Sequence, residues 1–304
     1  MLELAAIKDK YDNIYYVIYY NPKYDELFVL PKYIKENEKY HKIKNIEEFI
    51  KKVDYNITKK SKYLKREAII LEKSQIKVYY NPIAKLKRIF KEPNDDVEKV
   101  VKEFVELIAS EAKEELGNFG IGGSILVGLH KEDSDMDIAY YGKNPEIVYK
   151  ALKNLRERGI LMPLSREDLI KLYQERELTN IIEFPLFELL ERRKIIEGRF
   201  KDRIYSLKFI LRKNLEPSRI LGKKEIEIEI INDSKSFFFP SVYSARSKNS
   251  EEYTIVSFKL RYCEMLKKGE IALVRGNLEK GKEGEYRIVI QDHNDFIKPL
   301  YLSS

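Results

Sequence analysis

A Gly-Gly-Ser turn followed at a short distance by two alternating aspartates constrains this chain more than any other feature. The segment Gly122-Gly123-Ser124 is separated by ten residues from Asp135-Met136-Asp137. Glycines lack a Cβ, so their N–H groups can approach an anion closely, and the serine hydroxyl adds a donor. In a strand residues i and i+2 share a face, so Asp135 and Asp137 should point to one side. The segment therefore predicts a phosphate-binding turn beside a carboxylate pair of the kind that binds Mg²⁺.

Together the two halves match the pattern hG[GS]…Dh[DE]h, in which h is an apolar residue such as Ile121 or Met136. This pattern resembles the signature of the DNA polymerase beta-like nucleotidyltransferase superfamily. Three longer strings are similar to archaeal predicted nucleotidyltransferases: FGIGGSILVGLHKEDSDMDIAYYG, ELLERRKIIEGRFKDRIYSLKFI and VSFKLRYCEMLKKGEIALVRGNLE. The resemblance implies an α/β (α+β) catalytic domain of the nucleotidyltransferase type.

The activity that this resemblance implies is transfer of a nucleoside monophosphate from ATP or another triphosphate to an acceptor hydroxyl, releasing pyrophosphate. Two Mg²⁺ ions, or Mn²⁺ in their place, assist in-line displacements of this kind. Asp135 and Asp137 carry over as the catalytic metal ligands. Gly122, Gly123 and Ser124 carry over as nucleotide contacts.

A third carboxylate completes the family's pattern, and three residues compete for that role. Asp202 opens a strand expected over residues 203–211, and we assign it as the third catalytic carboxylate. Glu227 and Glu229 fit an apolar-acidic alternation, but the same alternation is typical of a solvated strand face.

Arg193 is our candidate for a further nucleotide contact. It lies in a basic cluster with Arg192, Lys194 and Arg199. Guanidinium groups bind phosphate in a bidentate manner, which suits a triphosphate. A solvated helical face is the alternative interpretation of the same cluster.

Two other phosphate-binding motifs fit this sequence poorly. Gly123 and Gly128 have the separation of a Walker A loop, but Leu129 and His130 stand where Lys and Ser/Thr are required. A dinucleotide fingerprint fails as well, because Ile125 stands where its third glycine should be.

Composition sets broader limits. The chain has 304 residues, a net charge of +7 and 43% hydrophobic residues, which exclude general disorder and permit a nucleic-acid partner. Cys263 is the single cysteine, so there is no disulfide framework, and the three histidines have no zinc spacing. We expect a cytoplasmic protein without a membrane partner. Heavy use of Lys, Glu, Ile and Tyr favours an archaeal source.

The pattern of apolar residues predicts three domains. Residues 1–92 alternate short β-rich runs with turns, including a hairpin over residues 13–31. Residues 93–215 form the expected catalytic domain, with helices beginning near residues 96, 145, 165 and 184 and the last ending at residue 197. Residues 216–304 predict a small β-barrel, with an OB-like form by analogy and a short helix over residues 262–267.

Two alternatives remain open from the sequence. A non-catalytic nucleic-acid-binding protein that retains the nucleotidyltransferase fold would explain the basic charge and the competition among three residues for the role of third carboxylate. For an enzyme, nucleic acid, a protein side chain and a small molecule all present acceptor hydroxyls.

Overall fold

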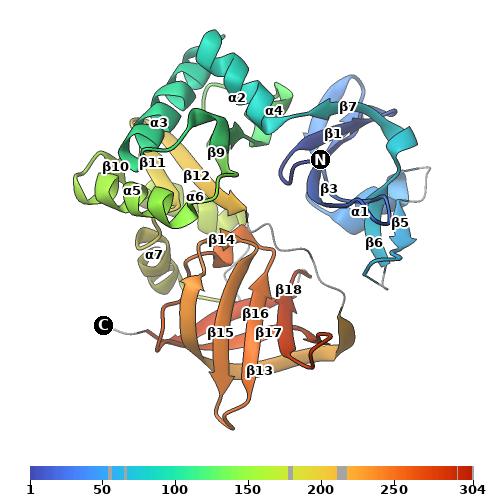
Figure 1. Ribbon diagram of the computed structural model, residues 1–304, viewed down its shortest axis with the longest axis vertical. Coiled ribbons are helices and arrows are strands. Elements are labelled where there is room, and N and C mark those ends of the chain that lie inside the picture. Colours follow the sequence, from blue (N-terminus) through green and yellow to red (C-terminus); the bar gives the residue numbers. More distant parts are fainter. Residues whose placement is uncertain (54–56, 65–66, 177–180, 211–217, 293, 303–304) are drawn as a thin grey trace. The chain divides into compact units, whose positions relative to one another are not determined.

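The computed structural model describes residues 1–302 except 54–56, 65–66, 177–180, 211–217 and 293. Within these residues the chain is a mixed α/β protein with three β-sheets and seven α-helices (Figure 1). This confirms the expected mixed fold class. Its contacts define two compact units, one containing residues 1–106 and 115–139, the other residues 107–114, 140–212 and 218–304. The division falls within a strand, so the three expected domain ranges stay predictions.

The N-terminal residues form a seven-stranded sheet in the order β5-β6-β3-β2-β1-β7, with β4 paired to β3. Its strands are β1 (Ala6–Asp9), β2 (Ile14–Asn21), β3 (Glu26–Glu36), β4 (Lys39–Lys42), β5 (Thr58–Lys60), β6 (Glu67–Leu71) and β7 (Ile76–Tyr80). Antiparallel pairing of β2 with β3 confirms the predicted hairpin. A short helix, α1 (Ile46–Lys52), is capped by Asn45, and a 3₁₀ turn spans Lys73–Gln75.

Both faces of this sheet pack into apolar clusters. Tyr15 and Val17 of β2 lie in one core with Ile7 of β1. The intervening Tyr16 points to the other face with Ala6, its register partner on β1. The alternation of side chains along β2 therefore contributes to two separate clusters.

Two helices lead from this sheet to the glycine-serine turn. Asn81 caps α2 (Pro82–Lys91), whose first residue is a proline. Asp95 accepts a hydrogen bond from the Glu98 N–H (2.9 Å) at the start of α3 (Asp96–Ala112). The predicted helix start near residue 96 is therefore confirmed.

The middle of the chain contributes a sheet in the order β10-β11-β12-β9-β8, with β14 paired to β12. Its strands are β8 (Phe119–Ile121), β9 (Met136–Tyr140), β10 (Leu161–Met162), β11 (Glu197–Phe200), β12 (Arg203–Ile210) and β14 (Phe238–Phe239). The helices among them are α4 (Gly123–Val127), α5 (Pro145–Glu157), α6 (Arg166–Glu175) and α7 (Phe184–Arg192), and a 3₁₀ turn spans Leu116–Asn118. A capping box of Ser165 and Asp168 starts α6, as the sequence predicts.

The last predicted helix of this region is too long. It was expected over residues 184–197, but α7 ends at Arg192 and β11 begins at Glu197. The Glu264 carboxylate accepts hydrogen bonds from the N–H groups of Ile195 and Ile196 (2.9 and 2.8 Å). A side chain distant in sequence thus accepts hydrogen bonds from N–H groups that would bond to backbone carbonyls if the helix continued.

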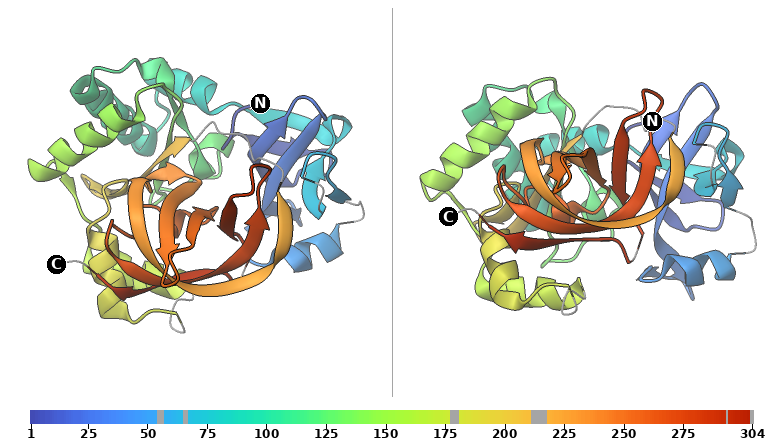
Figure 2. Two further views of the ribbon diagram at one scale, coloured as in Figure 1. Left: turned by 60° about the horizontal axis from the view of Figure 1, so that its bottom comes forward. Right: turned by 90° about the horizontal axis from the view of Figure 1, so that it is seen from below.

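The C-terminal strands form a sheet in the order β13-β15-β16-β18-β17-β19. They are β13 (Arg219–Lys235), β15 (Ser241–Ser247), β16 (Glu252–Ser257), β17 (Ile271–Lys280), β18 (Tyr286–Ile290) and β19 (Phe296–Tyr301). Because β13 also pairs with β17, the first five strands close on themselves, and Figure 2 shows them curving around a common core. The helix expected over residues 262–267 is wrong: a 3₁₀ turn, Leu260–Tyr262, stands there instead.

Every described helix is too short or too polar to cross a lipid bilayer.

Candidate functional site

The glycine-serine turn lies against the strand that carries the aspartates. The Gly122 N–H donates to the backbone carbonyl of Asp137 at 2.7 Å. This bond connects the end of β8 to β9 and places the first turn of α4 beside the Asp137 side chain. The two halves of the motif, separate in sequence, therefore form one local structure.

Gly123 is the point of closest approach. A Cβ built on it would stand 2.1 Å from the Asp137 Oδ2 atom, far inside van der Waals contact, and its φ is +59°. Only glycine adopts that backbone conformation at little cost and leaves room for the carboxylate. The motif requires glycine at position 123 because a side chain there would overlap the Asp137 carboxylate.

The aspartates have the alternation that the sequence predicts. Met136 and Ile138 are buried, whereas Asp135 is exposed and Asp137 is half-buried. Within the described residues, no group of three or more His, Cys, Asp or Glu side chains is arranged to hold a metal ion. Two carboxylates, Asp137 on β9 and Asp135 just before it, still fit Mg²⁺, which is commonly held by one or two carboxylates with water and substrate phosphates.

The loop between the two halves of the motif is held by His130. Its Nε2 atom lies 2.8 Å from Asp95 Oδ2, at the start of α3. The adjacent Lys131 is exposed, and its N–H donates to the Ser134 hydroxyl (2.8 Å). His130 therefore anchors the loop to α3, and the bond between Lys131 and Ser134 closes a turn within it.

The three candidates for a third carboxylate all lie in the second compact unit. Asp202 is exposed in the turn between β11 and β12, and its carbonyl accepts a hydrogen bond from Arg199 (2.6 Å). Glu227 and Glu229 lie on β13, where Glu227 forms an ion pair with Lys248 (2.9 Å). The role of Asp202 stays a prediction.

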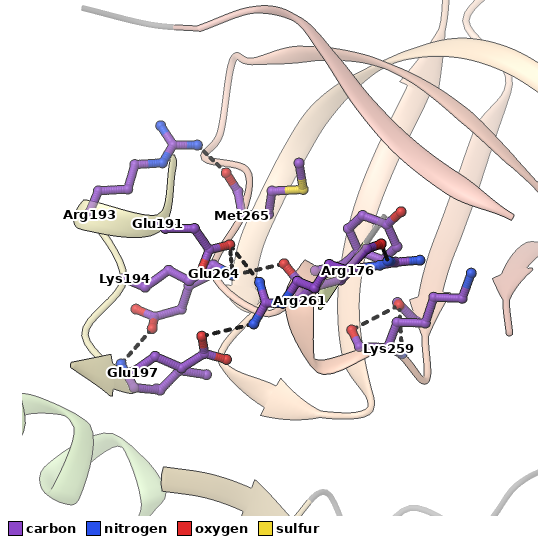
Figure 3. A network of polar contacts seen from close by, with 12 residues as sticks. Arg176, Glu191, Arg193, Lys194, Glu197, Lys259, Arg261, Glu264 and Met265 are labelled. Atoms are coloured by element: carbon purple, nitrogen blue, oxygen red, sulfur yellow. Dashed lines mark hydrogen bonds and ion pairs between the residues drawn. The ribbon is translucent and has the colours of Figure 1, made fainter. Parts of the chain in front are cut away.

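The four residues of the basic cluster form ion pairs with carboxylates of the second unit. Arg193 binds both carboxylate oxygens of Glu270, at 2.7 and 2.8 Å, and also donates to the Met265 carbonyl (Figure 3). The remaining three residues form the ion pairs Arg192–Glu188, Lys194–Glu191 and Arg199–Asp168. Arg193 could contact a nucleotide only after giving up Glu270, so its predicted role has no support from its surroundings.

A buried ionic network surrounds this cluster, and no sequence signal indicated it. Lys194 is fully buried and donates to Glu191 (2.7 Å) and to the Arg261 carbonyl (2.8 Å). Arg176 contacts Glu191 (3.0 Å) and Glu197 (3.3 Å). Burial would raise the pKa of Glu197, but the positive charges of Lys194 and Arg176 lower it. Figure 3 shows these charges gathered in one network with Arg261 and Glu264, which lie in the segment between β16 and β17.

Two tyrosines near Asp137 also escaped the sequence analysis. Burial raises the pKa of Tyr16 far above its ordinary value, and the neighbouring Tyr33 and the negative charge of Asp137 add to this rise. Burial and Asp137 likewise raise the pKa of Tyr33, although its hydrogen bond with Tyr16 opposes them. These residues are more than 100 positions from Asp137 along the chain, so local patterns could not associate them.

Comparison with known proteins gives one relative. The chain is 31% identical over 199 residues to "Uncharacterized protein MJ1086" of the archaeon Methanocaldococcus jannaschii. The alignment covers 60% of this chain, which in turn spans 58% of the length of that relative. No family model and no solved structure matches the chain.

Proposed function

We propose that the protein is a Mg²⁺-dependent nucleotidyltransferase of the DNA polymerase beta-like type. It would transfer a nucleoside monophosphate from a nucleoside triphosphate to an acceptor hydroxyl. The observation that carries the proposal is the close approach of Asp137 to Gly123, because the carboxylate that we assign to the metal lies against the turn that we assign to phosphate.

The turn would bind phosphate through short-range contacts. The first N–H groups of a helix have no partner within the helix. Ser124 belongs to the first turn of α4, and its hydroxyl is a further donor there. With five residues, α4 is too short to contribute much of a helix dipole. Hydrogen bonds, together with the close approach that Gly123 permits, would therefore provide most of the binding.

The carboxylates would hold the metal. Asp137, on β9, and Asp135, the residue just before that strand, offer oxygen ligands, and the buried Met136 and Ile138 anchor the strand. Bound Mg²⁺ would supply charge neutralisation at the transferring phosphate. The protein's own part is to fix the two carboxylates relative to the phosphate-binding turn.

The protein is incubated with each α-³²P-labelled nucleoside triphosphate and Mg²⁺ or Mn²⁺, either with RNA or without any other acceptor. The test is whether label is transferred to the RNA or to the protein itself. Asp135→Asn and Asp137→Asn should each lower the rate at least ~100-fold, about 3 kcal/mol of transition-state stabilisation. Glu227→Gln is the matched control, because that carboxylate is paired with Lys248. Full activity of a variant with both aspartates replaced would refute the proposal.

A non-catalytic nucleic-acid-binding protein is the second candidate, and the closed C-terminal strands favour it. We propose that they form an OB-like barrel, since five strands close through the β13–β17 pairing and β16 pairs in parallel with β18. Binding of single-stranded nucleic acid should then weaken steeply with salt. The protein would be titrated with single-stranded nucleic acid at low and high salt, with and without triphosphate. If the nucleic acid is an acceptor, it is extended when triphosphate is present, whereas a nucleic acid that is only bound stays unchanged.

A further inference from the structure

One face of the N-terminal sheet gathers four tyrosines from four different strands. They pack around a small apolar cluster together with three residues of α4 and of the loop after it. The members are Tyr16 of β2, Tyr33 of β3, Tyr40 of β4 and Tyr80 of β7, beside Leu126, Val127 and Leu129. Each tyrosine is only partly buried, so part of its side chain faces solvent.

Strand register places lysines on the same face as these tyrosines. Lys8 of β1 pairs with Ile14 of β2, which in turn pairs with Tyr33 of β3. Tyr33 then pairs with Lys42 of β4, which is exposed. Residues paired across neighbouring strands point to the same side of a sheet. One row across four strands therefore carries two lysines, with a tyrosine beside one of them.

Two further lysines of β3 lie close to tyrosines of this face. Lys35 is opposite Tyr40 in the pairing of β3 with β4. A register shift between β2 and β3 leaves Lys32 as an additional residue, and its ammonium lies 5.7 Å from the centroid of the Tyr16 ring. The ammonium of Lys8 lies 5.6 Å from the centroid of the Tyr40 ring. Positive charges thus stand within cation–π distance of two of the rings.

This face has an excess of positive charge. Asp12 and Glu38, in the turns next to it, both pair with Lys35, at 3.5 and 2.8 Å. Asp12 also pairs with Lys77 (2.6 Å). These two carboxylates therefore offset only part of the charge of the lysines. We name the face by its four aromatic and four cationic residues, the tyrosine-lysine face: Tyr16, Tyr33, Tyr40, Tyr80, Lys8, Lys32, Lys35 and Lys42.

We propose that the tyrosine-lysine face binds single-stranded nucleic acid. Aromatic side chains stack on bases of any sequence, and cations beside them neutralise the phosphates that connect those bases. An acidic protein segment would match the charge of the lysines but has no regularly spaced planar bases for the tyrosines. The combination of rings and cations on one sheet face therefore favours nucleic acid.

Packing against α4 gives the face a place in the proposed reaction. Leu126 lies in the same short helix as Gly123, so a strand bound beside this cluster would be near the phosphate-binding turn. Its terminal hydroxyl would be the acceptor: the hydroxyl oxygen bonds to the α-phosphorus, the bond to the pyrophosphate oxygen breaks, and the proton passes to solvent. This acceptor role rests on the proposed function, whereas the binding itself does not.

The experiment measures binding of fluorescein-labelled oligo(U) and oligo(dT) to the full chain by fluorescence anisotropy at several salt concentrations. Lys8→Gln combined with Lys42→Gln should weaken binding at least ~10-fold at low salt. It should also reduce the slope of log affinity against log salt by about 1.4, since each phosphate contact on a single strand contributes about 0.7.

Lys39→Gln combined with Lys51→Gln is the matched control. Both lysines are exposed, and both belong to the other side of the sheet: Lys39 alternates with Tyr40 along β4, and the helix of Lys51 packs there through Phe49. This variant should bind nearly as tightly as the wild type.

A pair of changes at Tyr40 tests stacking. Tyr40→Phe retains the ring and should bind like the wild type. Tyr40→Leu keeps an apolar side chain for the cluster but removes the ring, so it should weaken binding ~5-fold or more. The thermal unfolding midpoint of each variant shows whether its fold is intact.

Unchanged affinity and salt slope in the Lys8 and Lys42 double variant would overturn the proposal, as would an equal loss in the control variant or no binding by the wild type at low salt. Failure of the proposed function gives a different result. If the wild type binds through this face and transfers no label from any triphosphate, the binding surface stands and the nucleotidyltransferase proposal fails. If it transfers label but binds no oligonucleotide, the enzyme stands and this inference fails.

Discussion

His130 and Asp95 lie 2.8 Å apart, from Nε2 to Oδ2, and this contact ties the loop of the glycine-aspartate motif to the start of α3. The other oxygen of Asp95 accepts the Glu98 N–H (2.9 Å), so one side chain both caps a helix and holds a loop. The position of the candidate metal ligands therefore depends on a residue far from them in sequence.

Asp95→Ala should destabilise the protein by about 1–2 kcal/mol, because it removes the cap of α3 and the partner of His130. The free energy of unfolding, measured with urea, reports the loss. Asp96→Ala is the control, since Asp96 is exposed and forms an ion pair with the surface residue Lys99 (2.8 Å). It should change stability by less than about 0.5 kcal/mol. Equal effects of the two changes would contradict the capping role.

Gly123→Ala should abolish Mn²⁺ binding, whereas Gly128→Ala should not. Both glycines have positive φ, +59° and +72°, so both substitutions cost about 1–2 kcal/mol of backbone strain. A Cβ at Gly123 would displace Asp137, but a Cβ at Gly128 meets nothing within 4 Å. Calorimetric titration with Mn²⁺ checks the difference. Retained binding by Gly123→Ala would show that the carboxylate does not depend on this close approach.

Glu98 should contribute a pH-dependent part of the stability. Burial would raise its pKa, but hydrogen bonds from Arg88, the Asn94 N–H and Lys85 lower it from 4.5 to about 2. A carboxyl group with a lowered pKa stabilises the folded state above its unfolded value, and this contribution is lost as pH falls from about 4.5 to about 2. The contribution at neutral pH is about 3 kcal/mol.

Glu98→Gln should therefore be much less stable than the wild type at pH 7, and the difference should shrink as the solution approaches pH 3. Urea unfolding at a series of pH values measures both. Glu106→Gln, at an exposed position on the same helix, should show no such trend. A constant difference at all pH values would mean that Glu98 acts through packing rather than charge.

Lys194→Met should destabilise the protein by about 3–5 kcal/mol, because it leaves the buried Glu191 with an uncompensated part of its charge. Arg192→Met, two residues earlier, is the matched control. Its ion pair with Glu188 is partly exposed and should be worth about 0–1 kcal/mol. Similar losses for both variants in denaturant unfolding would remove the special role assigned to the buried lysine.

The sequence predicted those features whose causes lie within a few residues. One such feature is the capping box of Ser165 and Asp168. Another is the burial of Met136 between two aspartates that are exposed or half-buried. Gly123 could be selected by its motif, although the reason for it, the Asp137 carboxylate, required coordinates.

The features that were missed depend on residues distant in sequence. Helix α7 was extended too far because the apolar pattern continues past Arg192, whereas Glu264 binds the N–H groups of Ile195 and Ile196. Arg193 was assigned to a nucleotide because nothing near it in sequence reveals Glu270. The packing of Tyr16 and Tyr33 in one cluster with Leu126 of α4 depends in the same way on residues distant in sequence.

The length of β13 has a consequence for synthesis of the chain. Its 17 residues pair with β15 on one edge and β17 on the other, and both partners follow it in sequence. During translation β13 emerges first, so its edge toward β17 cannot be fully paired until residue 280 has been made. An unpaired strand edge invites association with other chains. The charged residues that alternate along Glu225–Ile230 would keep the nascent strand in solution until the ring of strands can close.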